Sequence, residues 1–162
     1  MEIAAFIYSL ANGGAERVVS QLVHFLEMKG MDVYLVLMNE DSTFPIQSKK
    51  KPFYLERSNS KERSFLKLIK LPCLAFKYHH FLKKNDIEKS ISFLTRPSLI
   101  SSLTTFFYSE RQIIISERSS PSNQYGYGNL QSKINSFLIK KLYIKVDLIV
   151  SNSKGNASDL IN

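Results

Sequence analysis

The sequence has few of the residues that mark cross-linked or metal-binding proteins. It contains one cysteine, Cys73, and no tryptophan among its 162 residues. A single cysteine excludes an internal disulfide and favours a reducing compartment, and we interpret it as a small buried apolar side chain rather than a nucleophile. The three histidines, His24, His79 and His80, show no ligand spacing with Cys73 or with a group of carboxylates. We therefore expect no metal site.

Long apolar runs are also missing. No stretch approaches the roughly 20 apolar residues that cross a bilayer, and the first apolar run, at residues 3–10, is short and has no basic segment before it. The start of the chain therefore does not resemble a signal peptide, and we expect a cytoplasmic protein. The sequence also has no Gly-x-Ser-x-Gly segment, so it gives no support to a serine hydrolase.

Positive charge is concentrated in one part of the chain. The formal net charge is +8. From Lys49 to Lys89 there are twelve Lys and Arg side chains against four acidic ones, an excess of eight that accounts for the whole net charge. Such a segment indicates a local anionic partner rather than a generally basic protein.

The first forty residues have the pattern of a βαβ unit. Residues 3–8 and 32–38 are continuous apolar runs, as expected for buried strands. Between them, apolar residues from Ala15 to Leu26 fall on one helical stripe, and we expect Glu27 to face away from it. Gly30 is a suitable helix stop. Strand, helix and strand in this order predict a right-handed crossover.

The same alternation continues along the chain. Further strands are predicted over residues 52–55, 90–94, 112–116 and 147–151, and helices over residues 61–85 (broken near Pro72), 97–108, 130–145 and after an N-cap at Ser153. Alternating apolar strands and helices predict an α/β fold with a Rossmann-like, doubly wound parallel sheet. In such sheets ligands bind at the carboxyl ends of the strands. Loops 9–14, 39–42, 95–98 and 117–127 are therefore expected at the functional edge.

One of these loops has a pattern suited to phosphate binding. Residues 12–17 read Asn-Gly-Gly-Ala-Glu-Arg, between the first predicted strand and helix. Paired glycines let the backbone approach a ligand closely, and a helix N-terminus offers free N–H groups and the positive end of its dipole to a phosphate. On spacing alone, a tight turn explains the glycines equally well. The loop lacks the third glycine of the dinucleotide fingerprint and the Gly-Lys-Ser/Thr of a Walker loop.

Residues 9–18, Ser-Leu-Ala-Asn-Gly-Gly-Ala-Glu-Arg-Val, resemble the opening of family-4 glycosyltransferases, which are retaining enzymes with the two-domain GT-B fold. The resemblance continues in Ile-Ser-Phe-Leu at 91–94, Ile-Ile-Ser-Glu-Arg at 114–118 and Asp-Leu-Ile-Val-Ser-Asn-Ser at 147–153, and it covers essentially the whole chain. It is greatest with bacterial enzymes that add sugars to polyprenyl-linked or cell-surface glycans. The resemblance implies that residues 1–162 form the N-terminal, acceptor-side half of a GT-B fold.

The resemblance also implies roles for four residues. Gly13 and Gly14 would approach the diphosphate of a nucleotide-sugar donor held mainly by the opposite domain. Glu117 and Arg118 would lie beside the acceptor and the reacting sugar, as the catalytic candidates. Many members of the family have a histidine where this chain has Arg118, and an arginine there suits an acceptor phosphate. Without the resemblance, Glu117 and Arg118 are an ordinary exposed pair. No metal or other cofactor is expected, because backbone amides, the helix dipole and basic groups would stabilise the leaving diphosphate.

The C-terminal donor-binding domain of that family has no counterpart in the sequence. The expected function is transfer of a sugar from a nucleotide-sugar donor to a lipid-linked or cell-surface glycan, and it requires a missing C-terminal domain or a partner subunit. The 162 residues alone are expected to have weak or no transferase activity. The alternative is a non-catalytic binding module or a split, inactive transferase half. Nucleic-acid binding is disfavoured, because the sequence has no recognisable nucleic-acid-binding fold.

Basic and apolar residues interleave between residues 64 and 85. The basic members are Lys67, Lys70, Lys77, Lys83 and Lys84. This mixture suits a helix on an anionic leaflet, with its lysines extending to the headgroups, so we expect peripheral binding to the inner face of the cell membrane. The lysine run at 49–51 would add to the same patch. The alternative is that the apolar residues pack on the sheet and the lysines form a solvated face, and for the aromatic residues this alternative is slightly favoured.

Overall fold

A single parallel sheet organises the chain. The computed structural model describes residues 1–11, 13–46, 48–56, 64–107, 110–118 and 130–161. Within these residues six strands pair in the order β3-β2-β1-β4-β5-β6, all parallel. They are β1 (Glu2–Ile7), β2 (Asp32–Leu37), β3 (Phe53–Tyr54), β4 (Lys89–Phe93), β5 (Gln112–Glu117) and β6 (Leu148–Ser151). The strand order reverses between β1 and β4, which confirms the predicted doubly wound, Rossmann-like sheet.

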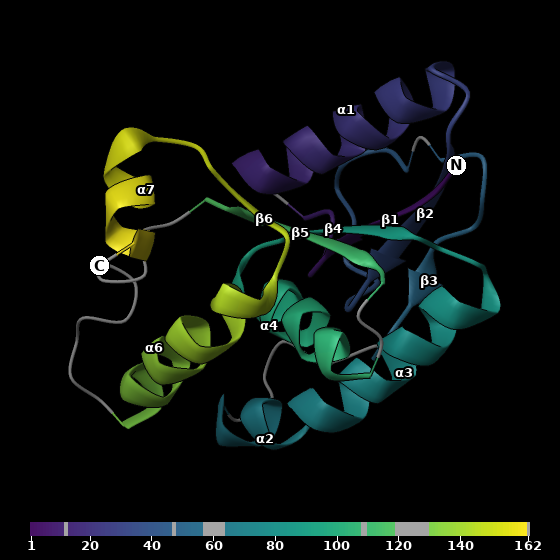
Figure 1. Ribbon diagram of the computed structural model, residues 1–162. Helices are drawn as coiled ribbons and strands as arrows, with labels where there is room; N and C mark the ends of the chain where they lie inside the picture. The colour runs from purple at the N-terminus through teal and green to yellow at the C-terminus, as the bar shows by residue number, and fades with distance from the viewer. Residues whose placement is uncertain (12, 47, 57–63, 108–109, 119–129, 162) are drawn as a thin grey trace.

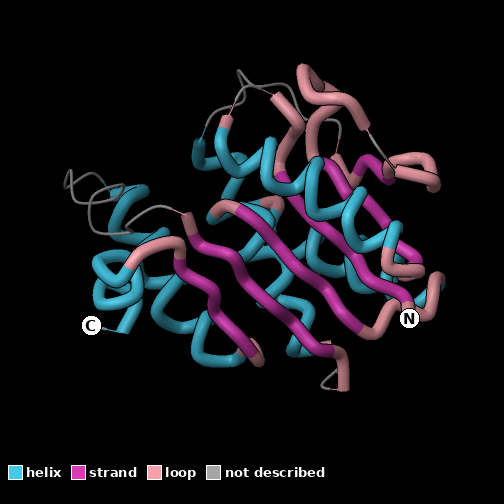
Figure 2. Tube along the Cα trace, turned by 90° about the horizontal axis from the view of Figure 1, so that it is seen from above, coloured by secondary structure: helices cyan, strands magenta, loops and turns pink. Residues whose placement is uncertain are grey.

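Helices cover both faces of the sheet. The described helices are α1 (Gly14–Met28), α2 (Ser64–Ile69), α3 (Leu71–Lys84), α4 (Thr95–Leu103), α6 (Leu130–Leu142) and α7 (Lys154–Ile161), and the 3-10 turns η1 (Thr104–Phe106) and η2 (Tyr143–Lys145) follow α4 and α6. In Figure 1, α1 lies on one face, and α2, α3, α4 and α6 lie on the other. Viewed from the α1 side, the strands at the β6 end of the sheet are uncovered (Figure 2). Accordingly, Leu148 and Val150 of β6 are exposed.

Each face of the sheet has its own apolar core. Under α1, the buried side chains Ala15, Val19 and Val23 pack against β1 and β2. On the other face, fully buried Tyr78 of α3 packs on the ring of Phe6, with 4.6 Å between the ring centroids. The Tyr78 hydroxyl is 2.7 Å from the Ser90 hydroxyl, and burial raises the pKa of Tyr78 well above its usual range. Tyr78 is thus a core residue, as the sheet-packing alternative predicts.

The helix boundaries follow the sequence signals. Helix α1 ends before Gly30, whose φ of 79° lies in the left-handed region that glycine adopts without strain. The predicted break near Pro72 is found between α2 and α3, at Lys70. The Ser153 hydroxyl accepts a hydrogen bond from the Asn156 backbone N–H at 3.1 Å, as expected for an N-cap. None of the described helices is long and apolar enough to span a bilayer.

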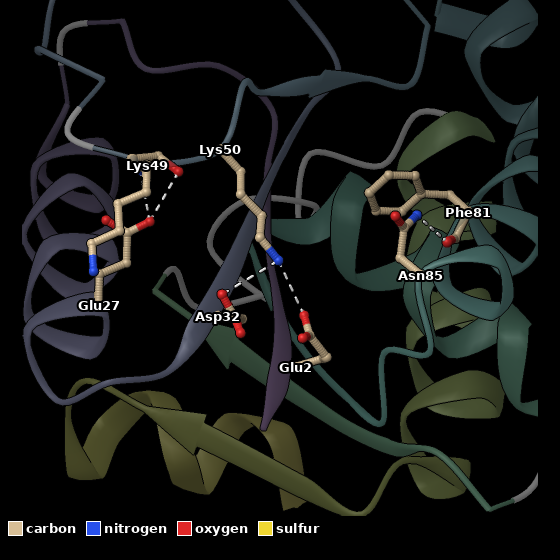
Figure 3. Close-up of polar contacts among 8 residues, drawn as sticks. Glu2, Glu27, Asp32, Lys49, Lys50, Phe81 and Asn85 are labelled. Atoms are coloured by element: carbon tan, nitrogen blue, oxygen red, sulfur yellow. Dashed lines mark hydrogen bonds and ion pairs between the residues drawn. The ribbon is translucent and has the colours of Figure 1, made fainter.

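Two local predictions are wrong. Glu27 is buried rather than outward-facing, because its carboxylate accepts hydrogen bonds from the Lys49 backbone N–H at 2.8 Å and the Ser48 hydroxyl at 3.3 Å (Figure 3). The loop before β3 therefore closes over the end of α1. Cys73 is exposed rather than buried, because it precedes Leu74, which faces the sheet, and so lies on the outer side of α3.

Candidate functional site

The carboxyl edge of the sheet brings the first two predicted loops together. Beyond the strand ends, the Met38 and Asn39 backbone N–H groups bond to the Tyr8 carbonyl at 3.0 and 2.8 Å. The Leu10 N–H bonds to the Asp41 carbonyl at 3.2 Å. The loops after β1 and β2 are thus joined by backbone hydrogen bonds, and the glycine pair follows directly from this joined segment.

Gly13 and Gly14 stand at the start of α1 with accessible backbone. Gly13 is extended, with φ −171° and ψ 163°, and neither glycine has a left-handed φ. A Cβ added at Gly14 would meet no atom within 4 Å, while one at Gly13 would overlap only the flexible carboxylate end of Glu16. A tight turn therefore gives no reason for glycine at either position. Open space beside a helix N-terminus leaves room for the close approach of a ligand.

Glu117 and Arg118 lie at the end of β5 in different surroundings. Glu117 is buried, and its Oε2 atom accepts a hydrogen bond from the Tyr143 hydroxyl at 2.8 Å. The interpretation of Glu117 and Arg118 as an exposed pair is therefore wrong for Glu117. Arg118 is half-buried, and its carbonyl accepts a hydrogen bond from the Asn152 amide at 3.4 Å. Residues 119–129 of the predicted loop lie outside the described residues, so the catalytic roles of Glu117 and Arg118 stay predictions.

The same edge holds a charge cluster that the sequence analysis did not identify. Glu56 follows β3, and its side chain is only 9% exposed. One carboxylate oxygen is 3.0 Å from Nη2 of Arg96, in the first turn of α4, and the other is 3.2 Å from Nζ of Lys70, at the α2–α3 break. Glu56 therefore joins the ends of β3 and α2 to the start of α4. No sequence pattern predicts this cluster, because its three charges come from segments that are distant in the chain.

The turn between β4 and α4 is strained. Leu94 has φ 68° and ψ 156°, a region that residues other than glycine rarely adopt. Such a conformation costs on the order of 1–3 kcal/mol and persists only where the surroundings enforce it. Its carbonyl accepts a hydrogen bond from the Ser98 N–H at 3.1 Å, and Arg96 of the same turn is paired with Glu56. The start of α4 is thus held in a fixed position at the functional edge.

Comparison with known proteins identifies the kind of domain. An N-acetylgalactosamine-N,N'-diacetylbacillosaminyl-diphospho-undecaprenol 4-alpha-N-acetylgalactosaminyltransferase of Campylobacter jejuni subsp. jejuni serotype O:2 is 41% identical over 160 residues, which are 99% of this chain and 43% of that protein. The structure of sucrose-phosphate synthase from Thermosynechococcus elongatus matches 99% of this chain and 45% of its own, with a TM-score of 0.75 and 14% identity. The chain therefore has the fold of an N-terminal GT-B domain, and over nearly its whole length its sequence is similar to that of a glycosyltransferase.

Other comparisons agree with this GT-B domain. The apo structure of the lipopolysaccharide outer core galactosyltransferase WaaB matches 99% of the chain and 42% of its own length, with a TM-score of 0.65 and 16% identity. No protein-family model matches the sequence. The GT-B domain spans less than half the length of each of the three proteins named here.

The five lysines predicted to bind a membrane differ in their surroundings within the GT-B domain. Lys70 is paired with Glu56, and the Lys77 ammonium donates a hydrogen bond to the Leu55 carbonyl. Lys83 and Lys84 are exposed in the last turn of α3. Since α3 leads into the start of β4, this turn lies toward the amino edge of the sheet, opposite the glycine loop. Lys67, the first of the five lysines in the sequence, lies in α2.

In the preceding lysine run, Lys49 and Lys51 are exposed, so their predicted addition to this set stays a prediction, whereas Lys50 has partners within the domain. Lys50 is 3.3 Å from the Glu2 carboxylate and 3.5 Å from that of Asp32, and its ammonium lies 3.7 Å from the centroid of the Tyr34 ring (Figure 3). Partial burial acts to lower the pKa of Lys50, but interactions with Tyr34 and Glu2 outweigh it and raise the pKa. Lys50 thus pairs with the acidic side chains at the starts of β1 and β2 instead of presenting a free charge.

Metal ligands do not cluster in the described part of the GT-B domain. No group of three or more His, Cys, Asp or Glu side chains within it is arranged to hold a metal ion. The described polar groups at the carboxyl edge include backbone amides, the Glu56–Arg96–Lys70 cluster and the buried Glu117 carboxylate. The backbone amides and basic side chains are chemically suited to an anionic ligand, and the Glu117 carboxylate is suited to a site of developing positive charge.

Proposed function

We propose that this domain forms the acceptor side of an enzyme that transfers a sugar from a nucleotide-sugar donor to a lipid-linked or cell-surface glycan. The supporting observation is 41% identity over 99% of the chain to a Campylobacter transferase whose name includes a diphospho-undecaprenol carrier. The donor half would come from a further part of the same protein or from a partner subunit. A domain of this kind without a donor half is expected to bind the acceptor and to catalyse little or no transfer.

The carboxyl edge suggests how the domain would contribute. The backbone N–H groups at Gly13 and Gly14, with the positive end of the α1 dipole, would stabilise the diphosphate that leaves the donor. Arg118 would contact the acceptor phosphate. Glu117, fixed by the Tyr143 hydroxyl, would supply negative charge beneath the reacting sugar. No metal is needed for these roles.

A chimera tests this function directly. We would join this chain to the part of the Campylobacter protein outside the matched region and supply the acceptor and donor of that protein. The chimera is expected to transfer sugar, because the two halves would rebuild one cleft, while the isolated chain should give no transfer above background. Product would be measured by mass spectrometry of the lipid-linked glycan. A folded chimera that transfers nothing, together with an isolated chain that binds the acceptor, would favour the non-catalytic binding module.

We propose also that exposed lysines of α3 bind an anionic membrane surface. Lys83→Gln with Lys84→Gln should weaken flotation with anionic vesicles by at least about tenfold, since each lysine near such a surface contributes about 1 kcal/mol. Lys70 and Lys77 should contribute less, because both have partners within the domain. The matched control, Lys29→Gln with Lys154→Gln, removes the same charge elsewhere. Equal losses in the two double variants would mean that only net charge matters.

A further inference from the structure

Four large apolar side chains in and beside α3, η1 and η2 are exposed on the outside of the helical layer. Phe76, Phe106, Phe107 and Ile144, the phenylalanine patch, are between 48% and 82% exposed. The rings of Phe76 and Phe107 meet edge to face, with 6.0 Å between their centroids. The Lys145 ammonium lies 4.4 Å from the centroid of the Phe106 ring, and Ile144 is its neighbour in η2. The Phe76–Phe107 contact thus links α3 to the end of η1, and the Lys145–Phe106 contact links η1 to η2.

The phenylalanine patch is not part of the core. In α3 the buried residues are on the face that includes Leu74, Tyr78 and Leu82, which pack against the sheet, whereas Phe76 lies on the opposite side. Exposed aromatic rings that contact one another are more typical of an interaction site than of scattered exposed residues. Burying the rings against another surface would remove them from water, which is favourable.

The position of the patch indicates which surfaces it can meet. Helix α4 begins at the carboxyl edge, so η1 at its other end lies near the amino edge, and η2 leads into the start of β6. The patch is therefore at the opposite end of the helical layer from Gly13, Gly14 and the other groups at the carboxyl edge. A donor half closing over the carboxyl edge would leave the patch uncovered.

Basic side chains lie beside two of the aromatic rings. The His79 ring lies 5.5 Å from that of Phe107. Burial lowers the pKa of His79, and the charges of Arg111 and Lys83 act in the same direction. Of these two cations Lys83 is exposed, whereas Arg111 is buried. Lys145 covers the patch from the other side. Two copies of a chain with net charge +8 would repel one another here, whereas an anionic surface would be attracted.

We propose that the phenylalanine patch inserts into the surface of an anionic lipid bilayer, with Lys145 and its basic neighbours binding the headgroups. Aromatic rings flanked by lysines are favourable at the boundary between headgroups and acyl chains. The inference rests on the proposed function in one respect: a lipid-linked acceptor would be held in the same bilayer. Insertion of the aromatic rings differs from adsorption by the α3 lysines, because apolar insertion persists at high salt, where charge attraction is screened.

The absence of tryptophan makes insertion directly measurable. Phe107→Trp introduces a single indole into the patch, and the matched variant Phe25→Trp places one at a half-exposed site on α1, on the other face of the sheet. With vesicles of equal parts phosphatidylglycerol and phosphatidylcholine, emission of the Phe107→Trp chain should shift to the blue and become protected from acrylamide. The Phe25→Trp chain should show neither change. Pure phosphatidylcholine should give a much smaller response.

Three results would overturn the proposal. Vesicle binding without an emission shift in Phe107→Trp would mean that the chain adsorbs by charge alone. A shift that grows with protein concentration before vesicles are added would mean that a second copy covers the patch. We expect the double variant Phe106→Ser with Phe107→Ser to lose about tenfold in vesicle partitioning, and the single variant Phe25→Ser to lose none. Equal partitioning of these two variants would mean that the patch does not contribute. Circular dichroism would check that each variant is folded. Sugar transfer by the chimera is measured separately, so the membrane proposal and the transferase proposal can each fail without the other.

Discussion

Replacing Gly14 with valine is expected to reduce sugar transfer by the chimera at least about a hundredfold while the domain stays folded. A Cβ at this position meets no atom within 4 Å, so the fold gives no reason for a large loss of stability. The branched side chain would occupy the space through which the diphosphate approaches the N-terminus of α1, and losing such charge stabilisation typically costs a factor of about 100 to 1000 in rate. The measurements are kcat/KM of the chimera and its melting temperature.

A control substitution is available in the same chain. Gly155 of α7 is also exposed, and a Cβ there would meet only the Ser153 hydroxyl at 3.9 Å. Gly155→Val should therefore leave transfer unchanged, although it introduces the same side chain near a helix start. Normal turnover by the Gly14→Val chimera would remove the diphosphate role from the glycine loop.

Replacing Glu56 with alanine is expected to lower the free energy of unfolding by about 3–5 kcal/mol, the usual cost of leaving one member of a buried ion pair without its partner. The Glu56 side chain is 9% exposed and that of Arg96 is 15% exposed, so water cannot solvate the guanidinium freely after the substitution. Urea denaturation of the 162-residue chain, monitored by circular dichroism, gives the change.

Two companion variants separate the buried pair from the surface pair. Lys70→Met should cost no more than about 1 kcal/mol, because the lysine side chain is largely solvated. Removing both buried charges, with Glu56→Leu and Arg96→Met, should recover most of the stability lost in Glu56→Ala. If Glu56→Ala and Lys70→Met cost the same, the Glu56–Arg96 pair contributes no more than a surface contact.

Most of the fold was predictable because its determinants are local. Most strands are short apolar runs, and α1 and α3 have apolar stripes, so the sequence alone places most elements to within a few residues. Gly30 and Ser153 act through their own backbone neighbours. The parallel sheet then follows, because alternating strands and helices have few other ways to bury their apolar faces.

The site was less predictable because its groups depend on distant partners. Glu27 has the spacing of an outward-facing residue and is buried only because the backbone of Ser48 and Lys49 folds over it. Glu117 is held by the Tyr143 hydroxyl, and Glu56 by Arg96, and no spacing rule links either pair. The glycine loop was identifiable because its pattern is confined to one short segment.

The central position of β1 has a consequence for how the protein is made. Ile3 pairs with Val33 on one side and with Lys89 on the other. During translation β1 gains its first neighbour early, but its second side stays open until β4 has left the ribosome, some fifty residues later. An open, apolar strand edge invites pairing with other nascent chains. Slow or interrupted translation within residues 38–89 would therefore expose the sheet at its centre, and this interval is where a chaperone would be needed most.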